Sequence, residues 1–227
     1  MSTNYNISAS TATTTTFSSL PENISLSLKN FALVLLLMVS LTGNTLILWA
    51  IYEDKRLRTN TNILIANMAV SDLIFPLVSV PTIVVALNFN RKWLIGGDFG
   101  VAICKLVHFL GEISFLISIY SCIFIALDRY YAVAHPFKGG FSRSRLKYII
   151  PGIWIFSGLV TSPYLRISRL KKYNDSYSCE LDWSQDGIPS GHLIHSISVT
   201  VLANGLTIPI IIILYSLIFI GFASKHF

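Results

Sequence analysis

Five long segments with almost no charged residues constrain this chain more than any other feature. Only Asp72 and Glu112 interrupt them with a formal charge. The segments run from Asn30 to Tyr52, Thr59 to Asn90, Leu106 to Leu127, Tyr148 to Leu165, and Gly187 to Ser224. Since about 20 apolar residues are enough for a helix to cross a bilayer, the repetition predicts five membrane-spanning helices.

The composition agrees with a membrane protein. Hydrophobic residues make up 53% of the chain and charged residues 12%, about half the share that soluble domains carry. The net charge of +6 comes with few exposed basic segments, so it does not indicate nucleic-acid binding. We therefore expect an all-α membrane protein, a transmembrane helix bundle, and no enzyme.

We divide the chain into three parts. Residues 1–28 are rich in Ser, Thr and Asn and are expected to be a disordered, glycosylated tail. Residues 29–223 are the expected transmembrane domain, and residues 224–227 begin a loop on the far side. The expected spans are approximately 30–52, 62–88, 101–134, 147–165 and 194–222.

The N-terminal tail indicates how the chain is oriented in the membrane. Asn6 and Asn23 each begin an Asn-X-Ser acceptor for N-glycosylation, as does Asn174 in a later loop. We therefore expect the N-terminus outside the cell, in a multi-pass protein of the plasma membrane. Basic residues are divided almost equally between the two sides, so the charge rule for loops does not test this orientation.

The cysteines fit the same topology. Cys104 and Cys179 both fall on the outer, oxidising side, where a disulfide is possible. Cys122 falls inside the third span, and a free buried thiol is the ordinary interpretation there. With three cysteines and no His/Cys pairs at ligand spacing, a structural zinc site is not expected.

Taken in order, a series of short motifs resembles the rhodopsin-like (class A) G-protein-coupled receptors. The resemblance covers the chain from Asn30 to Phe222. Its motifs are Gly43-Asn44, the run Asn67 to Leu73 with Asp72, Pro81, Trp93, Gly96, Cys104, Asp128-Arg129-Tyr130, Trp154, Pro163, Cys179 and Pro209. The resemblance implies a seven-helix receptor of which five helices are present, so the sequence would be truncated after the fifth.

Two residues near the fifth-span proline depart from the family. Leu206 stands where the family usually has Phe, and Leu217 where it has Tyr, with Tyr215 nearby. These departures leave the predicted fold unchanged and put the details of activation in doubt.

Asp72 is the strongest single functional candidate, because a carboxylate within a membrane span usually marks a polar pathway. The resemblance implies that Asp72 binds a sodium ion, with Asn44 and Ser118 in the surrounding polar network. Oxygen ligands suit such an ion. The alternative is a protonated, hydrogen-bonded interior acid.

Asp128-Arg129-Tyr130 stands at the inner end of the third span. The resemblance implies that Asp128 restrains Arg129 at rest and that Arg129 meets a G protein on activation. Pro136 and Phe137 follow in the second inner loop, where Phe137 is a further expected G-protein contact. A membrane-edge anchor and an interfacial aromatic are the alternatives for Arg129 and Phe137.

The ligand class is less constrained. Gly111 occupies the position of the Asp that amine receptors use, so a simple amine is disfavoured. His108, Glu112 and Phe115 complete the candidate pocket, which the Cys104–Cys179 disulfide would cover with a loop of mixed charge. That loop favours a peptide. Retinal stays an open alternative that these residues do not support, because its lysine would belong to a seventh span.

The predicted function is a receptor that senses an extracellular ligand and activates a heterotrimeric G protein. Apart from sodium, no cofactor is expected, and the bilayer is the other expected partner. Two alternatives stay open at this point. One is a truncated product that does not signal. The other is a transporter; internal repeats would favour it, but the sequence shows no such repeats.

Overall fold

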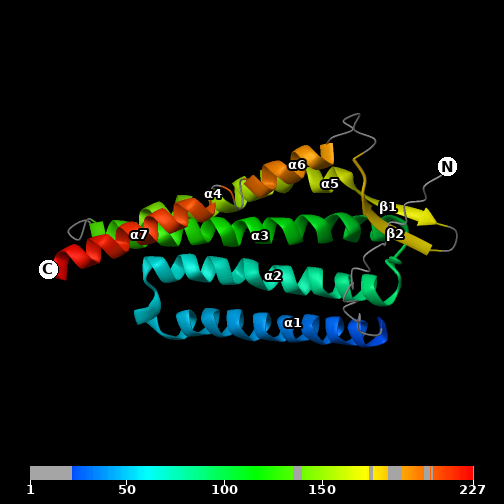
Figure 1. The fold of residues 1–227 in the computed structure, drawn as a ribbon, viewed down its shortest axis with the longest axis horizontal. Coiled ribbons are helices and arrows are strands. Elements are labelled where there is room, and N and C mark those ends of the chain that lie inside the picture. Colours follow the sequence, from blue (N-terminus) through cyan, green and yellow to red (C-terminus); the bar gives the residue numbers. More distant parts are fainter. Residues whose placement is uncertain are drawn as a thin grey trace, which may run out of the picture.

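The computed structural model is a bundle of helices closed at one end by a β hairpin (Figure 1). It describes residues 22–134, 140–173, 176–183, 191–201, 205 and 207–226. The elements, in order, are α1 (Glu22–Glu53), η1 (Lys55–Leu57), α2 (Asn60–Asn88), α3 (Gly97–Ala134), α4 (Arg143–Thr161), α5 (Pro163–Ile167), β1 (Ser168–Tyr173), β2 (Ser176–Leu181), α6 (Gly191–Thr200) and α7 (Thr207–His226).

The helix α3 is the central column of the bundle. It contacts α2, α4, α5, α7 and β1, whereas α1 packs on α2. In Figure 1, α1, α2 and α3 lie side by side, and α4 and α7 run along the other side of α3. One long helix therefore connects the hairpin end of the bundle with the opposite end.

Four helices in the described part of the chain are long and apolar enough to cross a membrane. They are Asn23–Glu53, Asn60–Asn88, Gly97–Ala134 and Arg143–Ile167. The fifth predicted span corresponds to α6 and α7, of which Thr207–Gly221 is a shorter apolar helix. The prediction of a transmembrane helix bundle is confirmed.

Side chains that face outward along these helices are mostly large and apolar. Examples are Leu35, Trp49, Ile155 and Leu159, each at least half exposed. In water such a surface would be unfavourable, but in hydrocarbon it is stable, because a helix pairs the backbone groups of its interior with one another. The exposure is thus what a lipid-facing wall requires.

Local signals set where several helices begin. The Thr59 hydroxyl accepts from the Asn62 N–H and the Ser142 hydroxyl from the Arg145 N–H, so each caps a helix N-terminus. The helix α1 begins at Glu22, so residues 22–28, expected to be tail, are helical in the structure.

The hairpin is an element that the sequence analysis did not predict. β1 and β2 pair antiparallel, from Ser168 opposite Leu181 to Tyr173 opposite Ser176. The Asp182 N–H donates to the Ile167 carbonyl at 2.8 Å and extends the pairing toward α5. The expected mixed-charge loop is therefore an ordered two-stranded sheet where the structure describes it.

Candidate functional site

A disulfide fastens the hairpin to the beginning of α3. Cys104 and Cys179 are bonded, with Cα atoms 5.7 Å apart across 75 residues of sequence. The Trp93 N–H also donates to the Tyr177 carbonyl at 2.6 Å, which ties the loop between α2 and α3 to β2. The structure thus contains the predicted disulfide and places it where it holds the hairpin across one end of the bundle.

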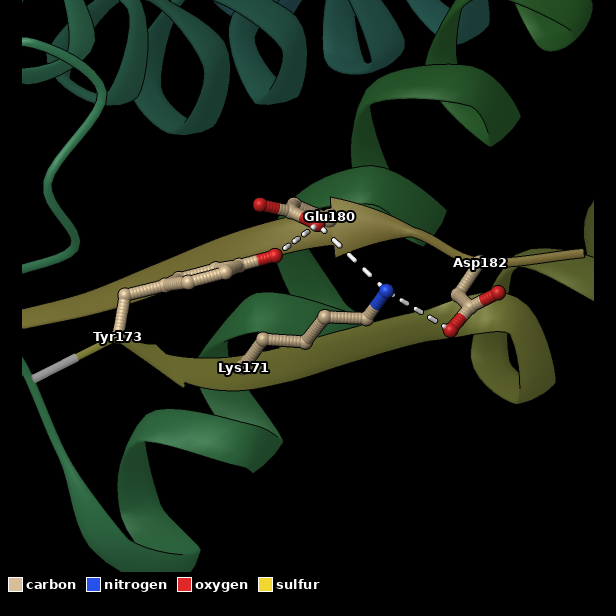
Figure 2. A network of polar contacts seen from close by, with 4 residues as sticks. All are labelled: Lys171, Tyr173, Glu180 and Asp182. Carbon is tan, nitrogen blue, oxygen red and sulfur yellow. Dashed lines mark hydrogen bonds and ion pairs between the residues drawn. The ribbon is translucent and has the colours of Figure 1, made fainter. Parts of the chain in front are cut away.

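A charged network covers one part of the hairpin (Figure 2). Lys171 Nζ lies 3.0 Å from Asp182 Oδ2 and 3.7 Å from Glu180 Oε2, and the Tyr173 hydroxyl donates to Glu180 at 3.2 Å. The hydrogen bond with Asp182 raises the pKa of Lys171, so its ammonium stays charged at neutral pH. The network cross-links the two strands by side chains in addition to their backbone ladder.

The hairpin also borders a cavity of about 480 Å³ at the mouth of the bundle, which we call the mouth cavity. Its lining includes Thr82, Ile83, Val85, Ala86 and Leu87 near the end of α2, together with Arg91, Lys92, Trp93, His108 and Glu180. Cations and a carboxylate therefore face the same space. The mouth cavity therefore offers partners for ligand groups of either charge.

The predicted pocket residues divide between two cavities. His108 lines the mouth cavity, and its Nδ1 lies 3.0 Å from the Cys104 carbonyl. Phe115 lines a different cavity, nearer the middle of the bundle, beside Asp72. Gly111 and Glu112 lie on α3 between these two levels and are partly buried. The four residues are thus not gathered in one site.

Cys104, His108 and Cys179 place a nitrogen and two sulfur atoms within 4.8 Å of one another. Both sulfurs are joined in the disulfide, so neither can act as the thiolate that a zinc ion needs. The cluster is a structural contact and does not form a metal site.

Asp72 lies where α1, α2 and α3 meet. Ser118 donates a hydrogen bond to its carboxylate, and the Ser118 and Ser71 hydroxyls are 2.8 Å apart. The Ser40 hydroxyl donates to the Asp72 carbonyl at 3.2 Å, and Asn44 Nδ2 donates to the Ser40 carbonyl at 2.9 Å. The structure therefore brings the three predicted residues, Asn44, Asp72 and Ser118, into one polar network.

A cavity of about 220 Å³ opens beside this network. Its lining carries oxygen atoms from Ser40, Asn44, Asp72, Ser114 and Ser118. Carboxylate, hydroxyl and amide oxygens are the donors that hard cations prefer, so the residues present fit a small cation.

A second polar node joins three helices through one amide. The Asn67 side chain, 8% exposed, donates to Ser121 Oγ at 2.9 Å and accepts from Trp154 Nε1 at 2.8 Å. Trp154, singled out from the sequence as a structural residue, thus anchors α4 to α2 and α3. Since all three groups lie within the membrane span, each depends on the others for its hydrogen bonds.

The Asp128 carboxylate forms the corresponding node at the end of the bundle away from the hairpin. It is 4% exposed and accepts hydrogen bonds from the Thr61 hydroxyl and, at 2.6 Å, from the Phe141 N–H. Asn60 Nδ2 donates to the Phe141 carbonyl at 2.5 Å. We call Thr61, Asp128 and Phe141 the Asp128 clasp, because they join α2, α3 and the segment before α4.

Arg129, the next residue, is exposed. It forms no ion pair with Asp128 in the described part of the chain, so the restraint of Arg129 by Asp128 stays a prediction. The neighbouring Tyr130 packs edge-on against Tyr131, with ring centroids 5.7 Å apart. Arg129 thus lies exposed in the last two turns of α3, beside the buried Asp128.

The other predicted residues are placed as follows. Pro163 is the first residue of α5, Pro209 lies in the first turn of α7, and Asn23 is exposed in the first turn of α1. Asn6, Pro136, Phe137 and Asn174 lie outside the described residues.

Three residues of the Asp128 clasp region escaped the sequence analysis: Thr61, Gly140 and Phe141. A Cβ on Gly140 would lie 2.9 Å from Asp128 Cγ and closer still to its Oδ1, so only glycine fits there. Thr61 is separated from Asp128 by 67 positions. No local sequence pattern indicates a contact between residues so far apart. The glycine pair before the helix-capping Ser142 does indicate a turn ahead of the next helix.

Comparison with known proteins gives one family over most of the chain. The family described as "7 transmembrane receptor (rhodopsin family)" matches residues 43–225. The matched range includes α2, α3, α4 and the hairpin, and hence both of the ends described above.

Individual relatives are moderately similar. The Substance-K receptor of Homo sapiens is 31% identical over 191 residues, which are 82% of this chain and 46% of that receptor. The QRFP-like peptide receptor of Branchiostoma floridae is 34% identical over 144 residues, 63% of this chain and 37% of that protein. The Neuromedin-K receptor of Rattus norvegicus is 29% identical over 197 residues, 85% and 41% respectively. The chain spans less than half the length of these curated relatives.

Proposed function

The chain belongs to the rhodopsin family of seven-transmembrane receptors, and from this premise we propose that it is receptor sequence for an extracellular peptide that signals through a heterotrimeric G protein. A receptor of this kind forms and breaks no covalent bond. It accelerates nucleotide release by stabilising one conformation of itself and its partner.

The Asp128 clasp beside the exposed Arg129 is the observation that carries the proposal. A buried carboxylate usually needs a cation, yet Asp128 is satisfied by a hydroxyl and a backbone N–H. That arrangement leaves the Arg129 guanidinium available for a protein partner. Five N–H donors in a rigid fork suit the carbonyl oxygens or the carboxylate at the end of a partner helix.

The mouth cavity supports a peptide as the ligand. Arg91 and Lys92 face it from one side and Glu180 from the other, so it offers partners for groups of both charges. The names of the relatives point the same way, since one is a QRFP-like peptide receptor. A volume of about 480 Å³ holds a few side chains, which suits one end of an extended peptide.

We propose a sodium site at Asp72, with Ser118 and Asn44 in the supporting network. When bound, sodium would neutralise the carboxylate inside the span. The residues themselves orient the site, because Ser118 and Ser71 hold the Asp72 side chain between α2 and α3.

The orientation follows from the same proposal. The hairpin, the disulfide and the N-terminus would face the outside, where a disulfide persists. Arg129 would then face the cytoplasm of a plasma-membrane protein. The sequons at Asn6, Asn23 and Asn174 would be available for glycosylation, and Pro136 and Phe137 would extend the G-protein contact beyond Arg129.

The direct test is nucleotide exchange. The receptor containing this chain would be reconstituted with a heterotrimeric G protein, and guanine-nucleotide release would be measured with and without the peptides substance K and neuromedin K. We expect at least one peptide of this type to accelerate release. Arg129→Ala should abolish that acceleration, because its guanidinium provides the proposed contact.

Arg143→Ala is the matched control, since it removes an exposed arginine from the same end of the bundle. It should leave the acceleration largely intact. Equal activity of Arg129→Ala and wild type, at equal surface expression, would contradict the role given to Arg129.

A further inference from the structure

A second cavity, distinct from the mouth cavity, lies between α3, α5 and β1. Its volume is about 490 Å³, and we call it the basic cavity. Its polar lining consists of Lys105, Arg166, Ser168, Arg169, Lys171 and Asp182. None of these residues lines the mouth cavity. Four cations against one carboxylate make the basic cavity strongly positive.

The one carboxylate in the lining, that of Asp182, already forms an ion pair. Asp182 lies 3.0 Å from Lys171, the pair shown in Figure 2. In contrast, Lys105 and Arg169 form no ion pair with any residue that the structure describes. The cavity therefore has cationic groups beyond those that Asp182 neutralises.

Two buried donors in the lining also have no acceptor among the described residues. The Ser168 side chain is 0% exposed, and its hydroxyl has no hydrogen-bond partner. The Nε of the adjacent Arg169 is also buried and also has no hydrogen-bond acceptor among the described residues. A buried donor without an acceptor is unfavourable, so these two donors favour a ligand that is rich in acceptor oxygens.

The position of the basic cavity identifies the source of such a group. Lys105 lies near the beginning of the span Gly97–Ala134, and Arg166 lies at the end of the span Arg143–Ile167. The ends of spans are where the headgroups of a bilayer meet the protein. The span that leads to Arg166 exposes Ile155, Phe156 and Leu159, which suit contact with acyl chains.

We propose that the basic cavity binds the phosphodiester of a membrane phospholipid. Its oxygens accept from Ser168 and Arg169, and its charge is neutralised by Lys105 and Arg169. The phosphodiester is common to all phospholipids, so the site does not require an acidic headgroup. An acidic peptide side chain has similar chemistry, but the location at the span ends and the separation from the mouth cavity favour a lipid.

The test is a titration of the detergent-purified protein with a soluble, short-chain phosphatidylcholine, with bound lipid counted by native mass spectrometry. Lys105→Gln and Arg169→Gln should each weaken binding about fivefold, the effect of one basic residue near a phosphate surface. Lys172→Gln is the matched control. This substitution removes one positive charge from β1, the strand that carries Arg169, at a position outside the basic cavity. The variant should bind lipid as wild type does.

Two further ligands separate the possible sources. Inorganic phosphate alone and a short polyglutamate peptide should each bind more weakly than the phospholipid. Lipid binding unchanged in both Lys105→Gln and Arg169→Gln would overturn the proposal, as would polyglutamate binding in place of phospholipid. The Lys105→Gln variant is expected to fold as wild type does, because the Lys105 side chain makes no hydrogen bond or ion pair in the described structure. Thermal unfolding of each variant checks this point.

Discussion

At the hairpin end of the bundle, a covalent bond, a six-residue strand pairing and the ion pairs of Lys171 with Glu180 and Asp182 hold the chain together. At the opposite end, the Asp128 clasp joins α2, α3 and the segment before α4 with two hydrogen bonds to one carboxylate. Both ends are carried by the same helix, α3. They therefore differ in the kind of bond that must break before the ends of the helices can move.

The difference indicates where a conformational change can occur. A disulfide does not open on the time scale of signalling, and the hairpin must move with α3. Hydrogen bonds to a carboxylate can exchange for others with a small net change in free energy. On the proposed function, such a receptor would keep the hairpin end fixed and let the Arg129 end rearrange.

Removing the disulfide should have the largest effect. Cys104→Ser releases a loop of 75 residues and should lower the free energy of unfolding by about 2–4 kcal/mol. Thermal unfolding in detergent measures this loss. Cys122→Ser, at the free cysteine, is the control and should change stability by less than about 1 kcal/mol. Equal stability of the two variants would show that the hairpin end does not depend on its covalent bond.

Gly140→Ala should come next. The added methyl group meets the Asp128 carboxylate, with its Cβ 2.9 Å from Cγ, and should reduce stability by about 2 kcal/mol through overpacking. Gly152→Ala is the matched control, because nothing lies within 4 Å of its Cβ position. That variant should be neutral or slightly more stable. A neutral Gly140→Ala would mean that the segment at residue 140 is not held against Asp128.

Thr61→Val should loosen the clasp without a change of volume. Among the described residues, the Phe141 N–H is then the one donor left to the buried Asp128 carboxylate, so the free energy of unfolding should fall by about 1–2 kcal/mol. On the proposed function, nucleotide exchange without ligand should rise, because the resting arrangement is weakened. Thr42→Val removes a hydroxyl that bonds only carbonyls of its own helix and should leave exchange unchanged.

Trp154→Phe should have the smallest effect of this series. It deletes the N–H that donates to Asn67 and should lower stability by about 1 kcal/mol. Trp49→Phe, at an exposed position of α1, is the comparison and should lie within about 0.5 kcal/mol of wild type. If both variants behave alike, the Asn67 node contributes nothing that the helix packing does not already supply.

The spans were predictable because the hydrocarbon of a bilayer favours apolar side chains along the whole length of a span. The run from Thr59 to Asn90, whose one charged residue is Asp72, corresponds closely to α2, Asn60–Asn88. The polar network at Asp72 was also predictable, since an acid within a span must have polar neighbours.

The hairpin was missed although the sequence carries a signal for it. Leu170 and Cys179 are strand partners on either side of Asn174 and Asp175, residue types typical of turns. The mixed charges of this segment led us to expect a loop without regular structure instead. The propensities of short strands are weak, and here the disulfide and the contact with α3 decide the outcome.

The Asp128 clasp could not have been predicted from local patterns. The motif with Arg129 suggested an ion pair between neighbours, whereas residues next to each other on a helix point in different directions. The partners that Asp128 has in the structure come from 67 residues before it and 13 after it. Only the packing of α2 and the segment before α4 against α3 brings them together.

Hydrogen exchange at single amides tests the contrast between the two ends most directly. Exchange at the Phe141 N–H and at the paired amides of β1 and β2 would be followed in the reconstituted receptor, alone and with peptide and nucleotide-free G protein. We predict that Phe141 is protected in the receptor alone and exchanges faster in the complex, while the strand amides stay protected. Unchanged protection at Phe141, or loss of protection in the hairpin, would contradict a fixed mouth and a releasable Asp128 clasp.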